Sequence, residues 1–283
     1  MITVTPVKPD QDQQIDKAEN LLPSTAWVSF DIETGPLPDN FLRQLMPEFV
    51  PPPEPGEFDE SSVKVGNLKD EAKILAKVLA ARQAHAASVL SYQADVEQAR
   101  LDQFATFKGT AALSATTGQV IAVGFAGPHG RIIKGQSREL SEIGLLKSLW
   151  TEVRLCLAES IPMLGHNIHG FDLPFCVQRS WLLGVPIPDG VITGGSGRKF
   201  WSPIFIDTMR EWGFGNPQAR IGLDELARAF GMDGKATADG EICGANFHEF
   251  WFSDDEERKR KAVEYVTRDV ELPAKIAAKM GLI

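Results

Sequence analysis

Apolar and polar residues alternate with a period of two in segment 27–33, WVSFDIE. Side chains alternate between the two faces of a strand, so this pattern predicts a strand with one wholly apolar face. Asp31 and Glu33 then share the other face, about 6.5–7 Å apart along the strand. Burying two like charges side by side is costly unless a cation neutralises them. An edge strand with a solvated polar face is the simpler alternative.

Further patterns predict an alternation of strands and helices along the rest of the chain. Ser253 and Glu256 fit a capping box at the start of the last helix. The expected elements are a β-hairpin over 119–135, a helix over 137–160, a strand over 161–165, a helix over 171–184, a strand over 204–207, helices over 222–232 and 246–252, and a terminal helix that begins at 253.

A long insertion separates the first strand from the hairpin. Its first part is rich in proline, which excludes regular structure, and no glycine or proline occurs between Gly66 and Gly109. That second part predicts one long helix or a helical hairpin. Its positive and negative charges nearly balance, which favours a structural or partner-binding role over a direct grip on DNA.

The order of these elements predicts one α/β domain with a mixed central sheet flanked by helices. The domain is expected to cover 25–283 and to be interrupted by the insertion at about 36–115. Residues 1–24 are polar and contain several prolines, so a flexible N-terminal arm is expected there.

Composition excludes several classes of protein. The 283 residues carry a formal net charge of −9, which argues against a broad electrostatic nucleic-acid binder. The three cysteines are far apart, so we expect reduced, buried thiols and neither a disulfide framework nor a zinc site. No apolar run approaches the about 18 residues of a membrane span, and no signal peptide is visible, so a cytoplasmic protein without membrane contact is expected.

Two further acids occupy positions that favour a role in a site. On a helical wheel, Asp269 lies in the middle of the apolar face of the last helix, and Tyr265 lies one turn before it on the same side. A buried aspartate paired with an arginine is the alternative. Asp172 begins a helix directly after a short apolar strand, a junction where α/β sheets often bind ligands, although a first-turn aspartate also suits the helix dipole.

Three motifs carry a resemblance to a known family. FDIET, HNIHGFDLPF and YVTRD occur in that order and resemble the motifs of the DEDD (DnaQ-like) 3′–5′ exonucleases, in the branch with a tyrosine four residues before the last aspartate. The second motif is especially similar to the proofreading domains of family B DNA polymerases, and IGLDELARAFGM is similar to the helix before the third motif. The resemblance covers roughly 27–33 and 119–280.

The resemblance implies a fold, a reaction and a site. The protein would have a ribonuclease H-like fold. It would cleave single-stranded DNA from the 3′ end and release nucleoside 5′-monophosphates. It would proofread in trans, beside a DNA polymerase or another replication protein. The likeness to stand-alone phage-type enzymes implies the cytoplasm of a bacterium or of a phage-infected host. The metal ligands would be Asp31, Glu33, Asp172 and Asp269, with Tyr265 orienting the attacking water.

Carboxylate oxygens are the ligands that Mg²⁺ or Mn²⁺ prefers, and two such ions about 3.5–4 Å apart can stabilise both the entering and the leaving oxygen. Asp207, at the end of an apolar strand, is a candidate to support the metal ligands without binding a metal ion itself. Candidates for contact with substrate are Thr34, His166, Asn167, Phe171, Arg198 and Lys199.

Two alternatives remain open at this point. The same site could act on RNA, because only contacts to the 2′-hydroxyl distinguish the two substrates. A non-catalytic module that binds a replication partner through the same fold and the helical insertion is the other alternative.

Overall fold

The computed structural model describes residues 27–192, 204–216, 218–234 and 241–283. The predicted N-terminal arm, 1–24, lies outside these residues. The chain divides into two compact units. The first unit consists of the chain up to Leu37 together with Ala111–Ile283, and the second is Pro38–Thr110. The second unit falls within the stretch that the sequence marks as an insertion.

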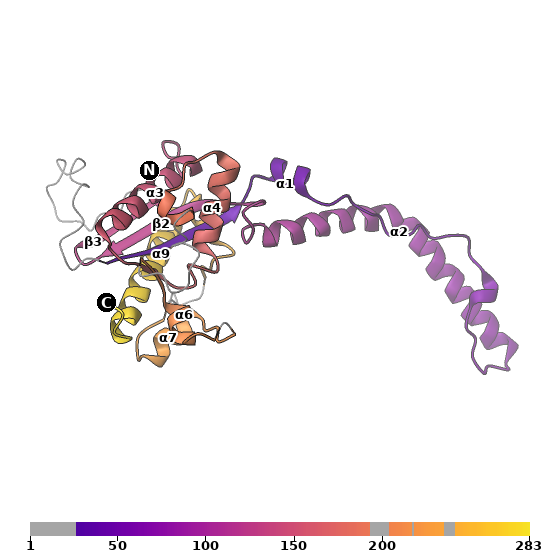
Figure 1. Ribbon diagram of the computed structural model, residues 1–283. Coiled ribbons are helices and arrows are strands. Elements are labelled where there is room, and N and C mark those ends of the chain that lie inside the picture. Colours follow the sequence, from indigo (N-terminus) through magenta and orange to yellow (C-terminus); the bar gives the residue numbers. More distant parts are fainter. Residues whose placement is uncertain (1–26, 193–203, 217, 235–240) are drawn as a thin grey trace. The chain divides into compact units, whose positions relative to one another are not determined.

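The first unit is built on a mixed sheet, two of whose strands, β2 and β3, are labelled in Figure 1. The sheet has five strands in the order β3-β2-β1-β4-β5. β1 pairs antiparallel with β2 and parallel with β4, β2 pairs antiparallel with β3, and β4 pairs parallel with β5. This order, with helices on both faces, is a ribonuclease H-like fold, as predicted. The strands are β1 Val28–Pro36, β2 Gly118–Gly127, β3 Gly130–Gly135, β4 Met163–Gly165 and β5 Phe205–Asp207.

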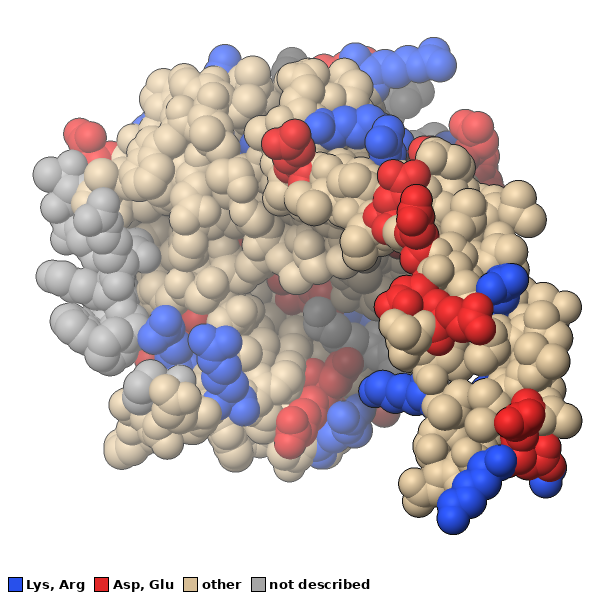
Figure 2. Space-filling view, turned by 90° about the vertical axis from the view of Figure 1, so that its right-hand side faces the viewer, with Lys and Arg blue, Asp and Glu red and all other residues tan. Residues whose placement is uncertain are grey.

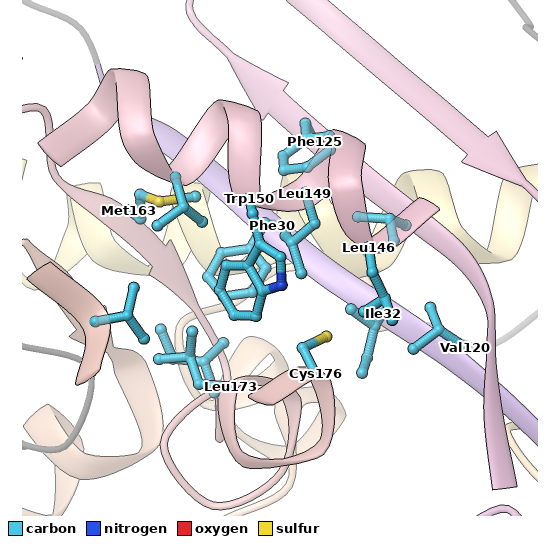
Figure 3. Close-up of a cluster of buried hydrophobic side chains, with 14 of the residues drawn as sticks. Phe30, Ile32, Val120, Phe125, Leu146, Leu149, Trp150, Met163, Leu173 and Cys176 are labelled. Carbon is cyan, nitrogen blue, oxygen red and sulfur yellow. The ribbon is translucent and has the colours of Figure 1, made fainter. Parts of the chain in front are cut away.

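Helices cover the sheet on each side. α3 and α4 cover one face, where their apolar residues pack against Phe30 and Ile32 of β1 (Figure 3). α8 and α9 cover the other face, and α7 packs beside the C-terminal half of α9. The helices of this unit are α3 Glu142–Glu159, α4 Asp172–Leu183, α5 Asp189–Ile192, α6 Thr208–Gly213, α7 Leu223–Ala229, α8 Phe247–Trp251 and α9 Glu256–Lys279.

The core explains the apolar face of the first strand. Phe30 is fully buried and Ile32 nearly so, and both join a cluster that contains Trp150 of α3 and Leu173 of α4 (Figure 3). With one face of β1 fully used in this core, its polar residues must lie on the face that α9 covers. The hydrophobic effect therefore sets the direction in which the acids of β1 point.

The start of α9 differs from the prediction. Asp255, rather than Ser253, caps the helix, and its Oδ1 accepts a hydrogen bond from the backbone N–H of Glu257 at 2.8 Å. The Ser253 hydroxyl instead accepts the backbone N–H of Asp255 at 3.1 Å. The predicted capping box was wrong, because an aspartate two residues further on binds an N–H group of the first turn.

The second unit contains a single long helix, α2 Glu71–Ala111, of 41 residues. Of the two predicted forms, one long helix or a helical hairpin, the structure has the long helix. The proline-rich segment before it runs antiparallel to the helix: the Tyr92 hydroxyl donates to the Pro52 carbonyl at 3.0 Å, and Arg82 pairs with Glu60 at 2.9 Å. Two short helices interrupt this segment where none was expected, α1 Asp39–Leu45 and the 3₁₀ turn η1 Glu60–Ser62.

This segment supplies contacts that α2 could not make alone. Arg82 and Arg100 stack on Phe58 and Phe49, with guanidinium-to-ring distances of 5.5 and 5.2 Å. A long helix without a strong apolar stripe gains little from propensity alone, so these side contacts stabilise it.

No helix among the described residues is long and apolar enough to cross a membrane.

Candidate metal centre

Three of the predicted metal ligands meet on the face of the sheet that α9 covers. Asp31 and Glu33 of β1 lie on either side of Ile32, whose side chain is buried on the opposite face. One carboxylate oxygen each from Asp31, Glu33 and Asp269 lie within 4.8 Å of one another. The acids that strand periodicity places on one face of β1, and the acid that the helical wheel places on the buried face of α9, therefore form a single cluster.

A glycine under α9 makes this approach possible. Gly124 of β2 lies opposite Asp31 in the strand register. A Cβ at this position would lie 2.6 Å from Cγ1 of Val266 and 2.7 Å from Cγ1 of Val270, the two valines that flank Asp269 on the buried face of α9. The bare backbone at Gly124 lets α9 come close enough for Asp269 to reach β1. A glycine inside a strand pattern was the sequence signal for such a close approach.

Gly124→Ala is expected to force α9 away from the sheet, because an added methyl group cannot fit against two valines. We expect a loss of about 1–3 kcal/mol in the free energy of unfolding, as for other overpacked cores. We also expect weaker Mn²⁺ binding, measured by isothermal titration calorimetry. Adding Val266→Ala removes one of the clashing methyl groups and should restore part of the affinity. An unchanged Mn²⁺ affinity in Gly124→Ala would contradict this account.

Asp172 lies outside the 4.8 Å cluster but is attached directly to the strand that carries two of its members. It is the first residue of α4, is 3% exposed, and its Oδ1 accepts the backbone N–H of Ile32 at 3.0 Å. β4 pairs with β1 only at Val28 and Ser29, so the edge of β1 beyond these residues has room for this side chain. Asp172 thus binds β1 between Asp31 and Glu33.

Tyr265 precedes Asp269 by one turn of α9, as the wheel predicted. Its ring is half-buried and packs against Phe247 of α8, with 6.0 Å between ring centroids. The aromatic contact restricts the ring, so the direction of the phenol is set by α8 as well as by α9.

The structure shows what each described substrate-contact candidate does within the protein. The Thr34 hydroxyl donates to the Ala112 carbonyl at 2.8 Å. The two ring nitrogens of His166 lie 2.9 Å from the Thr208 hydroxyl and 2.9 Å from the Ile221 carbonyl. Phe171 packs on the core and lies 5.4 Å from Phe175 between ring centroids.

Asn167 has a left-handed backbone, with φ of 64°, in the loop before α4. Arg198 and Lys199 lie outside the described residues. For all six candidates, contact with substrate stays a prediction.

A buried ion pair between α3 and α4 was not anticipated from the sequence. Glu142 of α3 and Arg179 of α4 form a two-pronged contact, with Nε to Oε1 at 2.8 Å and Nη2 to Oε2 at 2.7 Å. Glu142 Oε1 also accepts the backbone N–H of Val120, and Arg179 donates to the Ala115 carbonyl at 2.9 Å. The pair thereby fixes the turn between α2 and β2, which also receives the Thr34 hydroxyl just after Glu33.

The chemistry of the cluster fits a hard divalent cation. Asp269 is 2% exposed and Glu33 is 6% exposed, so two carboxylates of the cluster are nearly removed from water. Three adjacent carboxylates in such a place repel one another unless a cation neutralises them. Their oxygens match the preference of Mg²⁺ or Mn²⁺. Among the described residues the cluster contains neither histidine nor cysteine, so its ligand atoms suit such a cation better than zinc.

Comparisons with known proteins add a remote likeness. No protein-family model matches the chain, and no curated protein matches it. Among solved structures, the chain is similar to the family B DNA polymerase from the hyperthermophilic archaeon Pyrobaculum calidifontis, with 19% sequence identity and a TM-score of 0.42. The match covers 58% of this chain and 22% of the polymerase chain, so this chain spans about a fifth of that protein's length. At this level of similarity, function must be inferred from the side chains of the site.

Proposed function

We propose that this protein is a metal-dependent 3′–5′ exonuclease that hydrolyses single-stranded DNA to nucleoside 5′-monophosphates. The observation that carries the proposal is the meeting of Asp31, Glu33 and Asp269 within 4.8 Å on one face of the sheet. The three motifs that resemble DEDD exonucleases support the polarity, the product and the choice of DNA. Proofreading in trans beside a DNA polymerase is the setting that we infer for this activity.

Each acid has a part in holding the metal ions. Asp31, Glu33 and Asp269 would hold one divalent cation, and Asp172 would contribute to a second from its place against Ile32. Bound divalent cations of this kind generate a nucleophile from water and stabilise charge on the entering and leaving oxygens of a phosphodiester. The rigid strand and helix that carry these acids hold their carboxylates in place before substrate arrives.

Tyr265 would orient the attacking water. A phenol hydroxyl both donates and accepts hydrogen bonds, so it can hold a water molecule in line with the phosphorus without removing its proton. The packing of its ring on Phe247 supports this role, because an orienting group must itself be held in place.

Surface charge is consistent with recognition of phosphate through the metal ions. The chain has 38 acidic and 29 basic side chains, excluding histidine. Figure 2 shows acidic and basic side chains interspersed over the face in view. Binding to the phosphate backbone of DNA through many lysines or arginines would require a larger local excess of positive charge. The proposed site needs only the few phosphates at a strand end.

The proposal is tested with single-stranded DNA and RNA oligonucleotides that carry a label at either the 3′ or the 5′ end. With Mn²⁺ or Mg²⁺, 3′-labelled DNA should release labelled mononucleotide at once, and 5′-labelled DNA should form a ladder of shortened strands. Asp269→Asn should abolish both signals, and Tyr265→Phe should slow them while leaving Mn²⁺ binding unchanged.

Each alternative has its own outcome in this experiment. Faster loss of label from RNA than from DNA would show an exoribonuclease. Survival of both substrates with either metal would contradict catalysis and favour a non-catalytic module that binds a replication partner. Release of label first from the 5′ end would contradict the proposed polarity.

A further inference from the structure

Asp207 holds the loop that leads to Asp172. It is the last residue of β5, is fully buried, and accepts three backbone N–H groups. Its Oδ1 accepts from Asn167 at 2.8 Å and from Met209 at 3.1 Å, and its Oδ2 accepts from His169 at 3.0 Å. Asp207 thus caps α6 and at the same time binds two alternate residues of the loop between β4 and α4.

That loop has a conformation that needs such support. Asn167 is a non-glycine residue in the left-handed region, with φ of 64°, which costs conformational energy unless its surroundings hold it. From there the chain turns tightly, since the N–H groups of Gly170 and Phe171 both donate to the Asn167 carbonyl. Asp172 follows directly as the first residue of α4. The direction of its carboxylate therefore depends on the conformation of the loop.

The neighbour of Asp207 holds the beginning of the same loop. The Thr208 hydroxyl lies 3.1 Å from the Gly165 carbonyl, to which it donates, and 2.9 Å from Nδ1 of His166. The two residues at the junction of β5 and α6 therefore bind the loop at His166, Asn167 and His169.

The His169 ring adds a side-chain contact to this arrangement. The ring is 3% exposed, and its Nδ1 lies 3.5 Å from Oδ2 of Asp207. Nε of Arg210 lies 3.9 Å from the same oxygen. Burial raises the pKa of the Asp207 carboxyl, but the hydrogen bonds from His169 and Asn167 outweigh burial and leave the pKa below its ordinary value. Asp207 is therefore a buried anion at neutral pH.

We propose that Asp207, supported by His169, is a positioning residue that aims Asp172 at the metal centre. Asp207 acts through the backbone of the loop. Asp172 is then held in two ways. Asp207 binds the loop that precedes it, and the Ile32 N–H donates to its carboxylate. The inference rests on the proposed function, because it assigns Asp172 to a second metal ion.

Asp207→Asn tests this role with little change in size. The amide keeps one acceptor oxygen but places an NH₂ group against backbone donors, so the loop loses at least one hydrogen bond. Mn²⁺ binding to the full-length protein is measured by isothermal titration calorimetry and by electron paramagnetic resonance of free Mn²⁺. We expect two bound ions in the wild type and an affinity of the weaker ion lowered about 10–100-fold in the variant, as for other residues that orient metal ligands. The tighter ion should be unaffected.

Ser180→Ala is the matched control. It also removes a buried side-chain acceptor, the Ser180 hydroxyl that receives Nε1 of Trp150 at 2.8 Å, but it leaves the 166–171 loop intact. Both variants should lose stability, and only Asp207→Asn should change the binding of the second Mn²⁺. Equal Mn²⁺ binding by Asp207→Asn and Ser180→Ala would overturn the proposal. A wild-type protein that binds one Mn²⁺ would overturn it as well.

His169→Asn provides a second variant in case Asp207→Asn does not fold. It keeps the backbone N–H that donates to Asp207 and removes the ring contact, so the second Mn²⁺ should bind several-fold more weakly. Unchanged binding would exclude a role for the His169 ring. A selective loss of the second ion in either variant, with no cleavage of DNA or RNA by the wild type, would uphold the positioning role and contradict the proposed nuclease function.

Discussion

The Asp31→Asn protein is expected to melt at a higher temperature than the wild type in the presence of EDTA. Three carboxylates within 4.8 Å repel one another without a cation, and a neutral amide of nearly the same size removes two of these repulsions. At such separations each repulsion is worth on the order of 1 kcal/mol or more. Removing two such repulsions therefore gains about 2 kcal/mol or more, which corresponds to a rise in melting temperature of about 4–8 °C for a domain of this size. Thermal unfolding followed by circular dichroism measures the shift.

The same substitution should remove the function that the repulsion serves. Mn²⁺ stabilises a protein that binds it only when folded, so the melting temperature of the wild type should rise with Mn²⁺ while that of Asp31→Asn stays almost constant. Nuclease activity should fall on the order of 10³-fold or more, because metal stabilisation of the transition state is worth several kcal/mol.

Glu256→Gln is the control for Asp31→Asn. Glu256 lies at the start of α9, and its side chain is 85% exposed. This variant should keep the wild-type melting temperature in EDTA, the wild-type response to Mn²⁺ and the wild-type activity. If Asp31→Asn proved less stable than the wild type in EDTA, the three acids would not repel one another as their positions imply.

Arg179→Met is expected to produce the largest loss of stability. It leaves the Glu142 carboxylate buried without its guanidinium partner, and breaking a buried pair in this way costs about 3–5 kcal/mol. The side chain of Arg179 is 6% exposed and that of Glu142 is 10% exposed, so water cannot replace the missing partner. Urea denaturation followed by tryptophan fluorescence gives the difference in the free energy of unfolding.

A second substitution in the same chain identifies the buried charge as the cause. Glu142→Gln combined with Arg179→Met removes the charge, while the amide oxygen can still accept the backbone N–H of Val120. The double variant should therefore be more stable than Arg179→Met alone. Equal stability of the two variants would show that the loss comes from packing or from the bond to Ala115 rather than from an unpaired carboxylate.

Local sequence patterns predicted the parts of the site that depend on one element at a time. The alternation of apolar and polar residues in 27–33 places Asp31 and Glu33 on one face of the strand. The helical wheel of the last helix places Asp269 on its buried side, between Val266 and Val270. The order of the elements predicted the mixed sheet. These predictions succeed because strand and helix periodicities are properties of the local backbone, and because burial of apolar side chains is the main driving force for folding.

The predictions that were wrong or left open concern segments in which two local conformations have similar free energies. Asp255 rather than Ser253 caps α9, although both residues are good caps. The insertion could have been one helix or two, and the segment along α2 decided the outcome through contacts such as the one between Tyr92 and Pro52. The free-energy differences between such options are small, so contacts from distant residues decide them.

The period of polar and apolar residues was enough to predict the order of strands and helices, and the face of β1 and of α9 on which each acid lies. The distance between those faces depends instead on the missing side chain at Gly124, which lets α9 approach the sheet. The place of Asp172 likewise depends on distant residues, because Ile32 binds its carboxylate and Asp207 binds the loop before it. Periodicity specifies the direction of a side chain about its own element. The distance between two elements depends on the packing of residues far apart in the chain.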